Sequence, residues 1–195
     1  MERSPFWRHW YDREHWPYAA DRRITEELAN WFKQVRWRLF CTFTFPGVVS
    51  DQQAIKAFDE FINQLEHYLQ CDVGYLRGDE KRHSGCGKPG CPRHFHALLT
   101  CVRPVASELV EFLWSSKVGR RSDGDSAQVK PYDPNLNGVS YVLKYNNQPN
   151  GDWAFRNIHL FLPLMAGEEI TKRMRRHLLR HPALVQFRQG QVSGG

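Results

Sequence analysis

Two histidines separated by one residue, followed by an apolar run, constrain this chain more than any other feature. Residues 94–99 read His-Phe-His-Ala-Leu-Leu. This composition predicts a buried β-strand, in which side chains alternate between the two faces of a sheet. His94 and His96 would then share one face, with Cα atoms about 6.5 to 7 Å apart, close enough for both rings to reach one metal ion. The pair predicts either a metal site or two packed histidines within a sheet.

A second group of reactive side chains lies in residues 139–145, which read Val-Ser-Tyr-Val-Leu-Lys-Tyr. They follow a turn-rich stretch with asparagines that can cap a helix. Residues three and four apart are neighbours on a helix, so Tyr141, Lys144 and Tyr145 would project from one face. That face is either a cluster of two phenols and an ammonium group or the core side of an amphipathic helix.

The remaining pattern predicts an α/β (α+β) fold, with a central, mostly antiparallel sheet flanked by helices. Residues 38–45 alternate strictly before a Pro-Gly pair, which predicts a strand with these residues facing inward: Leu39, Cys41, Phe43 and Phe45. Helical periodicity or capping signals indicate helices over about 21–35, 51–70, 107–117 and 168–179. Further strands are expected over about 73–78, 127–131 and 153–162.

Three of these segments, in this order and at these separations, resemble the HUH endonuclease superfamily of Rep and rolling-circle initiator proteins. The strand Thr42-Phe43-Thr44 is similar to the first family motif. Residues 94–96 resemble the histidine-hydrophobic-histidine metal motif, and Tyr141 with Lys144 resembles the nucleophile motif. The resemblance covers about residues 36–162 and implies an HUH/Rep nuclease-like fold.

The resemblance also implies an activity: a metal-dependent tyrosine endonuclease that nicks and joins single-stranded or hairpin DNA. Such enzymes initiate rolling-circle replication or transposition of mobile genetic elements. His94 and His96 would hold Mn²⁺ or Mg²⁺, while Tyr141 would attack phosphorus and form a 5′-phosphotyrosine. Lys144 would stabilise the charge on the phenolate or phosphate. Tyr145 is a second candidate nucleophile, but only Tyr141 is followed by a lysine at the family spacing.

A third metal ligand is expected, because two imidazoles alone hold a hard ion poorly. The resemblance points to an acidic residue in the preceding strand or at its end. Glu80 is therefore the first choice and Asp79 the second. Compared with compact family members, this chain has about a dozen extra residues between that acid and His94.

The extra segment contains two cysteines, Cys86 and Cys91. They would either bind a structural zinc ion or flank a glycine-proline turn. A zinc site would also need His83 and a distant cysteine such as Cys71 or Cys101.

The formal net charge of +6 favours a polyanionic partner. Both charged segments would suit a solvated surface, but they also supply candidate DNA contacts. These contacts lie in the basic helix and in the loop at residues 117–125: Lys172, Arg173, Arg175, Arg176, Arg120 and Arg121.

Cysteines without paired spacing, and no apolar run suited to a membrane span or signal peptide, predict an intracellular protein, cytoplasmic or with host DNA. No Walker A pattern appears, so a helicase would be either a separate partner, like the replication machinery, or a part of the chain outside this sequence.

The sequence divides into an aromatic and basic N-terminal arm and helix (1–35), an HUH nuclease core (36–165) and a basic C-terminal helix with a flexible tail (166–195). The arm would fold over the domain or stack on unpaired bases.

Two other functions stay open. One is a non-catalytic nucleic-acid-binding module in which the histidines and Tyr141 only pack. The other is a phosphodiesterase whose nucleophile is a metal-bound water.

Overall fold

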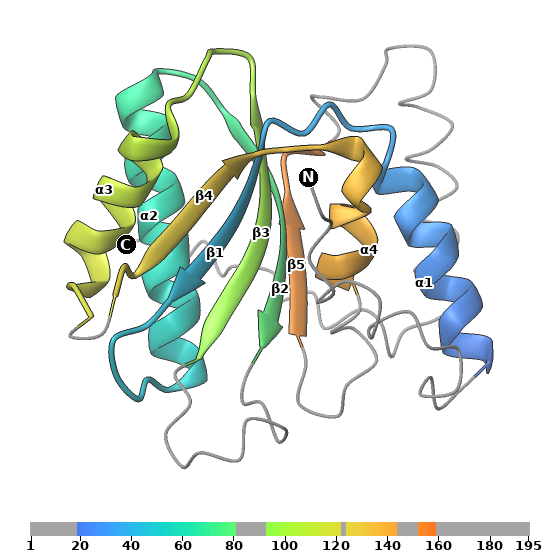
Figure 1. The fold of residues 1–195 in the computed structure, drawn as a ribbon, viewed down its shortest axis with the longest axis horizontal. Coiled ribbons are helices and arrows are strands. Elements are labelled where there is room, and N and C mark those ends of the chain that lie inside the picture. The colour runs from blue at the N-terminus through green and yellow to red at the C-terminus, as the bar shows by residue number, and fades with distance from the viewer. Residues whose placement is uncertain (1–18, 81–92, 122–123, 144–151, 159–195) are drawn as a thin grey trace, which may run out of the picture.

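The computed structural model describes residues 19–80, 93–121, 124–143 and 152–158. These residues form one sheet with a layer of helices on each face (Figure 1). The α+β class and the flanking helices are therefore as predicted. In chain order the elements are α1 (Ala19–Phe32), β1 (Leu39–Thr44), α2 (Asp51–Leu69), β2 (Val73–Glu80), β3 (His94–Cys101), α3 (Ser107–Val118), β4 (Ala127–Pro131), the 3₁₀ helix η4 (Pro134–Leu136), α4 (Gly138–Leu143) and β5 (Asp152–Arg156).

The strands lie in the order β4-β1-β3-β2-β5, and every neighbouring pair is antiparallel. β1 and β2 consequently run parallel with β3 between them, and β3 and β4 run parallel with β1 between them. The chain from β1 to β4 is thus a β-α-β-β-α-β unit of the split βαβ type. This topology makes β3 the central strand with β1 beside it, and these two strands carry the His-Phe-His and Thr-Phe-Thr segments singled out in the sequence.

Helices α2 and α3 cover one face of the sheet (Figure 1). A capping box at Ser50 starts α2: its hydroxyl accepts from the Gln53 amide at 3.2 Å, and its own amide donates to Gln53 Oε1 at 3.0 Å. The apolar stripe of α2 packs on the inward residues of β1 and the residue after it, all of which are buried as predicted: Leu39, Cys41, Phe43 and Phe45. This layer holds the larger of the two cores.

Helices α1 and α4 cover the other face and form a second, smaller core with Leu76 of β2 and Leu98 of β3. α1 ends at Phe32, three residues before the predicted end at residue 35. The reason is local: the Trp37 indole N–H donates to the Phe32 carbonyl oxygen at 2.8 Å, and the Val35 amide donates to the same oxygen. These bonds satisfy a carbonyl group that a longer helix would have used.

Two strand boundaries differ from the prediction. β2 continues to Glu80 instead of ending at Gly78, because Asp79 and Glu80 keep pairing with β3. β5 is confined, within the described residues, to Asp152–Arg156, near the start of the predicted 153–162. The predicted N-terminal arm, basic C-terminal helix and extra cysteine segment lie outside the described residues, so the division of the chain into 1–35, 36–165 and 166–195 stays a prediction.

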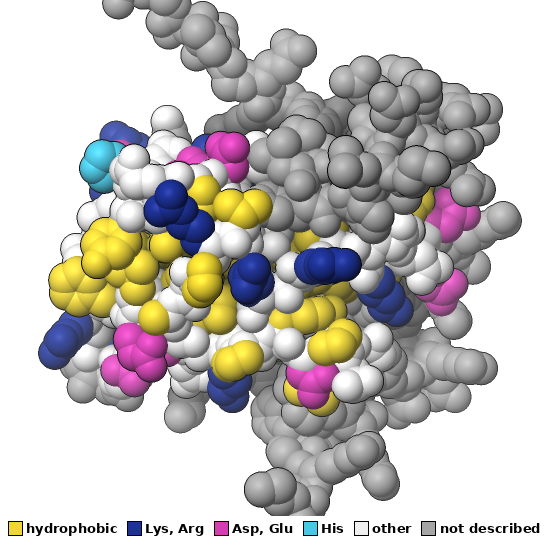
Figure 2. Space-filling view, turned by 90° about the horizontal axis from the view of Figure 1, so that it is seen from above, with side chains coloured by type: hydrophobic (Ala, Val, Ile, Leu, Met, Phe, Trp, Pro, Cys, Tyr) yellow, Lys and Arg dark blue, Asp and Glu magenta, His cyan; other side chains and the backbone are white. Residues whose placement is uncertain are grey.

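Figure 2 views the molecule from above, toward the end of the sheet where β3 and β4 finish. Apolar side chains are interleaved there with lysine and arginine side chains. Large apolar residues that are exposed near this end include Tyr68 on α2, Val102 after β3 and Leu136 in η4. Within the described parts of the chain, no helix combines the length and apolar character needed to cross a bilayer.

Candidate metal centre

The two histidines of β3 point toward the face that carries α4, at the end of the sheet opposite the one in Figure 2. Strand pairing sets Glu80 of β2 directly opposite His94, and both Gly78 and Thr42 opposite His96. Glu80 Oε2 lies 2.8 Å from His94 Nε2 and 3.1 Å from His96 Nε2. One potential ligand atom from each of these three residues falls within 4.8 Å of the other two. The fold therefore brings together both predicted histidines and the first-choice acid.

Burial and chemistry make this group suited to a divalent cation. Glu80 and His96 are only 4% and 6% exposed, whereas the His94 side chain is 21% exposed, so His94 marks the side nearest solvent. A buried carboxylate needs compensation by hydrogen bonds or by positive charge. Two imidazole nitrogens and one carboxylate oxygen form a donor set that proteins use for divalent transition-metal ions. The residues present thus fit a divalent metal ion.

Thr42 of β1 contacts the other side of the His96 ring. Its Oγ1 lies 3.2 Å from His96 Nδ1. When Nδ1 carries the proton and donates it to Thr42, the Nε2 lone pair faces Glu80 and is available to a cation. Thr42 thus holds the orientation of one candidate ligand, and its hydroxyl can accept the Nδ1 proton in the tautomer that leaves Nε2 free.

Helix α4 places Tyr141 beside His96. The Tyr141 hydroxyl lies 3.5 Å from His96 Nε2, and the two rings meet edge to face with centroids 4.8 Å apart. The Phe40 ring contacts both, at centroid distances of 5.8 Å to Tyr141 and 6.2 Å to His96. Two rings, those of Phe40 and His96, therefore hold the phenol at the edge of the candidate metal centre.

Gly138 at the start of α4 explains how the helix comes so close to the sheet. A Cβ atom at Gly138 would lie 3.0 Å from Tyr132 Cε2, 3.2 Å from Phe40 Cδ2 and 3.5 Å from Leu98 Cδ2. Only a residue without a side chain fits this approach without displacing its neighbours. Tyr141 follows three residues later, so the contact at Gly138 determines the height of the phenol above the sheet.

Asp79, the second-choice ligand, is on the wrong face of the sheet, because side chains alternate along β2. It is fully buried beneath α2 and pairs with Arg93 through two contacts, one of them 2.9 Å from Arg93 Nε to Asp79 Oδ1. Arg93 also donates to Asp51 at the start of α2, at 2.7 Å. This network joins the ends of β2 and β3 immediately before Glu80 and His94, and so supports the centre from behind.

Other predicted site residues lie elsewhere. Arg120 and Arg121 line a separate groove on α3 and the loop after it. Cys101 pairs with Val73 at the far end of β2 and β3, about 23 Å from Glu80 by strand rise, and Cys71 is its neighbour. That distance disfavours Cys71 and Cys101 as ligands of a zinc site near Glu80.

The other predicted site residues fall outside the described parts of the chain: His83, Cys86, Cys91, Lys144, Tyr145, Lys172, Arg173, Arg175 and Arg176.

Sequence reasoning did not assign the positioning roles of Thr42, Gly138 and Arg93. The alternation of the strand placed Thr42 on the face opposite Cys41 and Phe43. Its contact with His96 followed only from the pairing of β1 with β3. Gly138 and Arg93 owe their roles to contacts with segments distant in the sequence.

Comparisons with protein-family models, with curated proteins and with solved structures find no match for this chain.

Proposed function

We propose that this chain is an HUH Rep-type endonuclease that nicks single-stranded DNA and transfers the strand through a phosphotyrosine. The observation that carries the proposal is the position of Tyr141, whose hydroxyl lies 3.5 Å from His96 Nε2. Cleavage of a phosphodiester by a tyrosine requires a nucleophile next to a site for positive charge. A phenol beside two imidazoles and a carboxylate supplies both. The net charge of +6 supports a polyanionic substrate.

Glu80, His94 and His96 would hold the metal ion, with Mn²⁺ or Mg²⁺ as the proposed choice. When bound, such an ion polarises the phosphate and neutralises the charge that grows on its oxygens. Thr42 keeps the His96 ring in place through Nδ1. The Arg93–Asp79 pair holds the strand ends from which Glu80 and His94 project.

In the proposed reaction, Tyr141 Oη bonds to phosphorus and the bond between phosphorus and the 3′ oxygen breaks. The phenol proton passes to solvent and the departing oxygen takes up a proton, so the products are a 5′-phosphotyrosine and a free 3′ hydroxyl. Because this ester retains the energy of the phosphodiester bond, a later 3′ hydroxyl can attack it and rejoin the DNA. Lys144 is the proposed stabiliser of the phenolate, and Tyr145 is the second candidate nucleophile.

A covalent-adduct assay tests the proposal. The protein is incubated with a single-stranded DNA library and Mn²⁺, and attached DNA is detected as a shifted band on a denaturing gel. We expect Tyr141→Phe to abolish both nicking and the adduct, and Tyr145→Phe to keep the adduct. Tyr68→Phe, which alters an exposed tyrosine of α2, is the matched control.

Each rival function gives a different result. If the protein were a phosphodiesterase that uses metal-bound water, the Tyr141→Phe variant would still cut DNA and no adduct would form. A non-catalytic binding module would bind DNA but cut none, with or without the substitution. Peptide mass spectrometry locates the attached nucleotide, and an adduct on Tyr145 alone would overturn the assignment of Tyr141. The His94→Ala, His96→Ala double variant should lose cleavage while keeping most of its DNA affinity, which rests on cations and stacking.

A further inference from the structure

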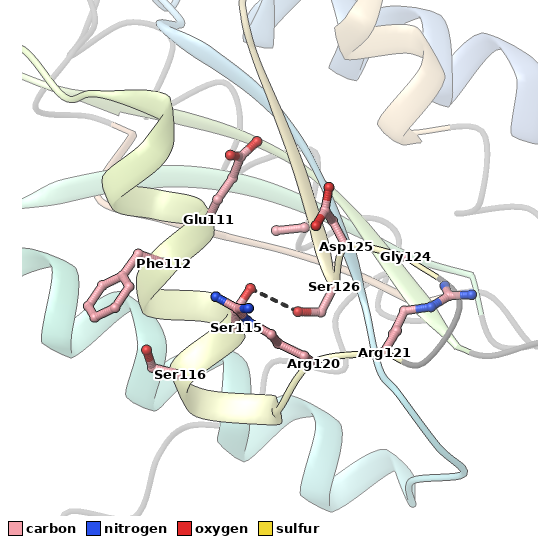
Figure 3. Close-up of a pocket in the computed structure, with 10 residues that line it drawn as sticks. Glu111, Phe112, Ser115, Ser116, Arg120, Arg121, Gly124, Asp125 and Ser126 are labelled. Atoms are coloured by element: carbon pink, nitrogen blue, oxygen red, sulfur yellow. Dashed lines mark hydrogen bonds between the residues drawn. The ribbon is translucent and has the colours of Figure 1, made fainter.

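A groove of about 560 Å³ lies between the last turns of α3 and the bend that leads into β4 (Figure 3). Its volume is in the range of small-ligand sites. Its lining includes three serines, Ser115, Ser116 and Ser126, and two arginines, of which Arg120 turns toward the serines and Arg121 is directed away from them (Figure 3). Ser126 is only 1% exposed, and its hydroxyl is hydrogen-bonded to that of Ser115 at 2.9 Å. The wall at this point is therefore fixed by buried polar contacts.

The groove opens at the same end of the sheet as the candidate metal centre. The Ser126 carbonyl oxygen accepts from the Thr44 amide at 2.8 Å, and Thr44 in turn pairs with His94. Ser126 is thus two strand spacings from His94, or about 10 Å. The groove lies on the face of the sheet that carries α3, and the candidate metal centre lies on the face that carries α4, so an extended ligand that reaches both passes around this end of the sheet.

The distribution of charge in the groove favours an anion. Figure 3 shows Arg120 folded back over α3 toward the Ser115–Ser126 pair. The carboxylates of Glu111 and Asp125 lie on the side of the groove away from that pair. Glu111 already accepts from the Val129 amide at 3.0 Å. A guanidinium group beside serine hydroxyls is a donor set that matches the oxygens of a phosphate.

We propose that this groove binds a backbone phosphate of the DNA strand that flanks the cut. This inference rests on the proposed endonuclease function. Because the path around the end of the sheet is longer than the spacing of about 10 Å between the strand backbones, the strand would span more than about three nucleotides at ~3.4 Å per nucleotide. Holding one phosphate in the groove would determine which phosphate faces Tyr141, so the groove would help to select the position of the nick.

The test measures binding without cleavage, in a Tyr141→Phe background. The affinity for a single-stranded oligothymidylate is determined by fluorescence anisotropy at several salt concentrations. Arg120→Gln with Arg121→Gln should make the slope of log affinity against log salt shallower by about 0.7, the value for one lost phosphate contact on a single strand. The control, Arg36→Gln with Arg103→Gln, removes the same charge from exposed residues at the opposite end of the sheet. Thermal melting confirms that both variants are folded.

A second measurement uses oligonucleotides shortened one nucleotide at a time. The parent protein should show a step in affinity when the phosphate that reaches the groove is removed, and the Arg120/Arg121 variant should lack this step. An unchanged salt slope together with an unchanged step would overturn the inference, even if the adduct assay succeeds. If the adduct assay fails but the slope and the step both change, the groove binds DNA and only the endonuclease proposal is lost.

Discussion

Single atoms on either side of the His96 ring decide what the ring can bind. Nδ1 faces the Thr42 hydroxyl and Nε2 faces Glu80, so the ring is held at both nitrogens. A partner on the far side of a ligating histidine fixes the tautomer and raises the basicity of the ligand. Thr42 would therefore influence metal binding at the candidate centre without touching the metal.

Thr42→Val tests this influence, since valine keeps the shape and the strand preference of threonine but has no hydroxyl. We expect Mn²⁺ affinity to fall about 10- to 100-fold, the usual range for loss of such a partner. Thr42→Ser, which retains the hydroxyl, should bind nearly as well as the parent. Isothermal titration calorimetry measures both, and equal dissociation constants for Thr42→Val and the parent would contradict the role.

At the scale of elements, α4 and the strands make separable contributions. The candidate ligands come from β2 and β3, whereas the phenol comes from α4, whose closeness to the sheet depends on Gly138. A change that lifts α4 should therefore affect chemistry more than metal binding.

Gly138→Ala is such a change, because its Cβ would meet Tyr132 and Phe40 at 3.0 and 3.2 Å. We expect a loss of stability of about 1–3 kcal/mol from overpacking. Adduct formation should slow by up to about 100-fold, as for a displacement of about 1 Å, while Mn²⁺ affinity stays the same. Gly47→Ala is the control, because nothing lies within 4 Å of its added Cβ. A parallel loss of metal affinity in Gly138→Ala would show that the two contributions are not separable.

Helix α2 carries a group with a pH-dependent effect on stability. Burial raises the pKa of the Asp59 carboxyl above its usual value, although Arg77 and Arg156 act in the opposite direction. The folded state then binds this proton more tightly than the unfolded state, so the contribution of Asp59 to stability falls as pH rises through the folded pKa. Asp59→Asn should be more stable than the parent at pH 7, with a difference that shrinks on acidification. Urea unfolding between pH 4 and 7 measures this, and a difference that grows on acidification would reverse the sign.

At the scale of the whole molecule, the candidate metal centre joins strands that are separated in the sequence. A ligand that binds only the folded state stabilises it by about 2.7 kcal/mol at 100 times its Kd. For a chain of this size, that corresponds to a rise in Tm of roughly 5 to 10 °C. We expect Mn²⁺ to produce this rise in the parent and EDTA to reverse it. The His94→Ala, His96→Ala variant should show no rise; an equal rise there would place the metal elsewhere.

Periodicity alone predicted much of the fold. The alternation of residues 39–45 and the apolar stripe of 51–69 identified β1 and α2 because both signals are local. Register and strand order are not local, so the sequence left Glu80 and Asp79 as competing ligands. Pairing of Glu80 with His94 resolves that choice. The end of α1 was missed for a similar reason, since it depends on a side chain beyond the helix, that of Trp37.

The pairing of Glu80 with His94 also bears on protein engineering. Because the two residues face each other across β2 and β3, the chain that connects them leaves and re-enters the sheet at the same place. The relative positions of the Glu80 and His94 side chains are set by this strand pairing and not by the length of the connection. A reporter domain could be inserted between the two residues, or the chain divided there into two fragments. Recovery of metal binding would then report that the fragments had reassembled with the native strand pairing.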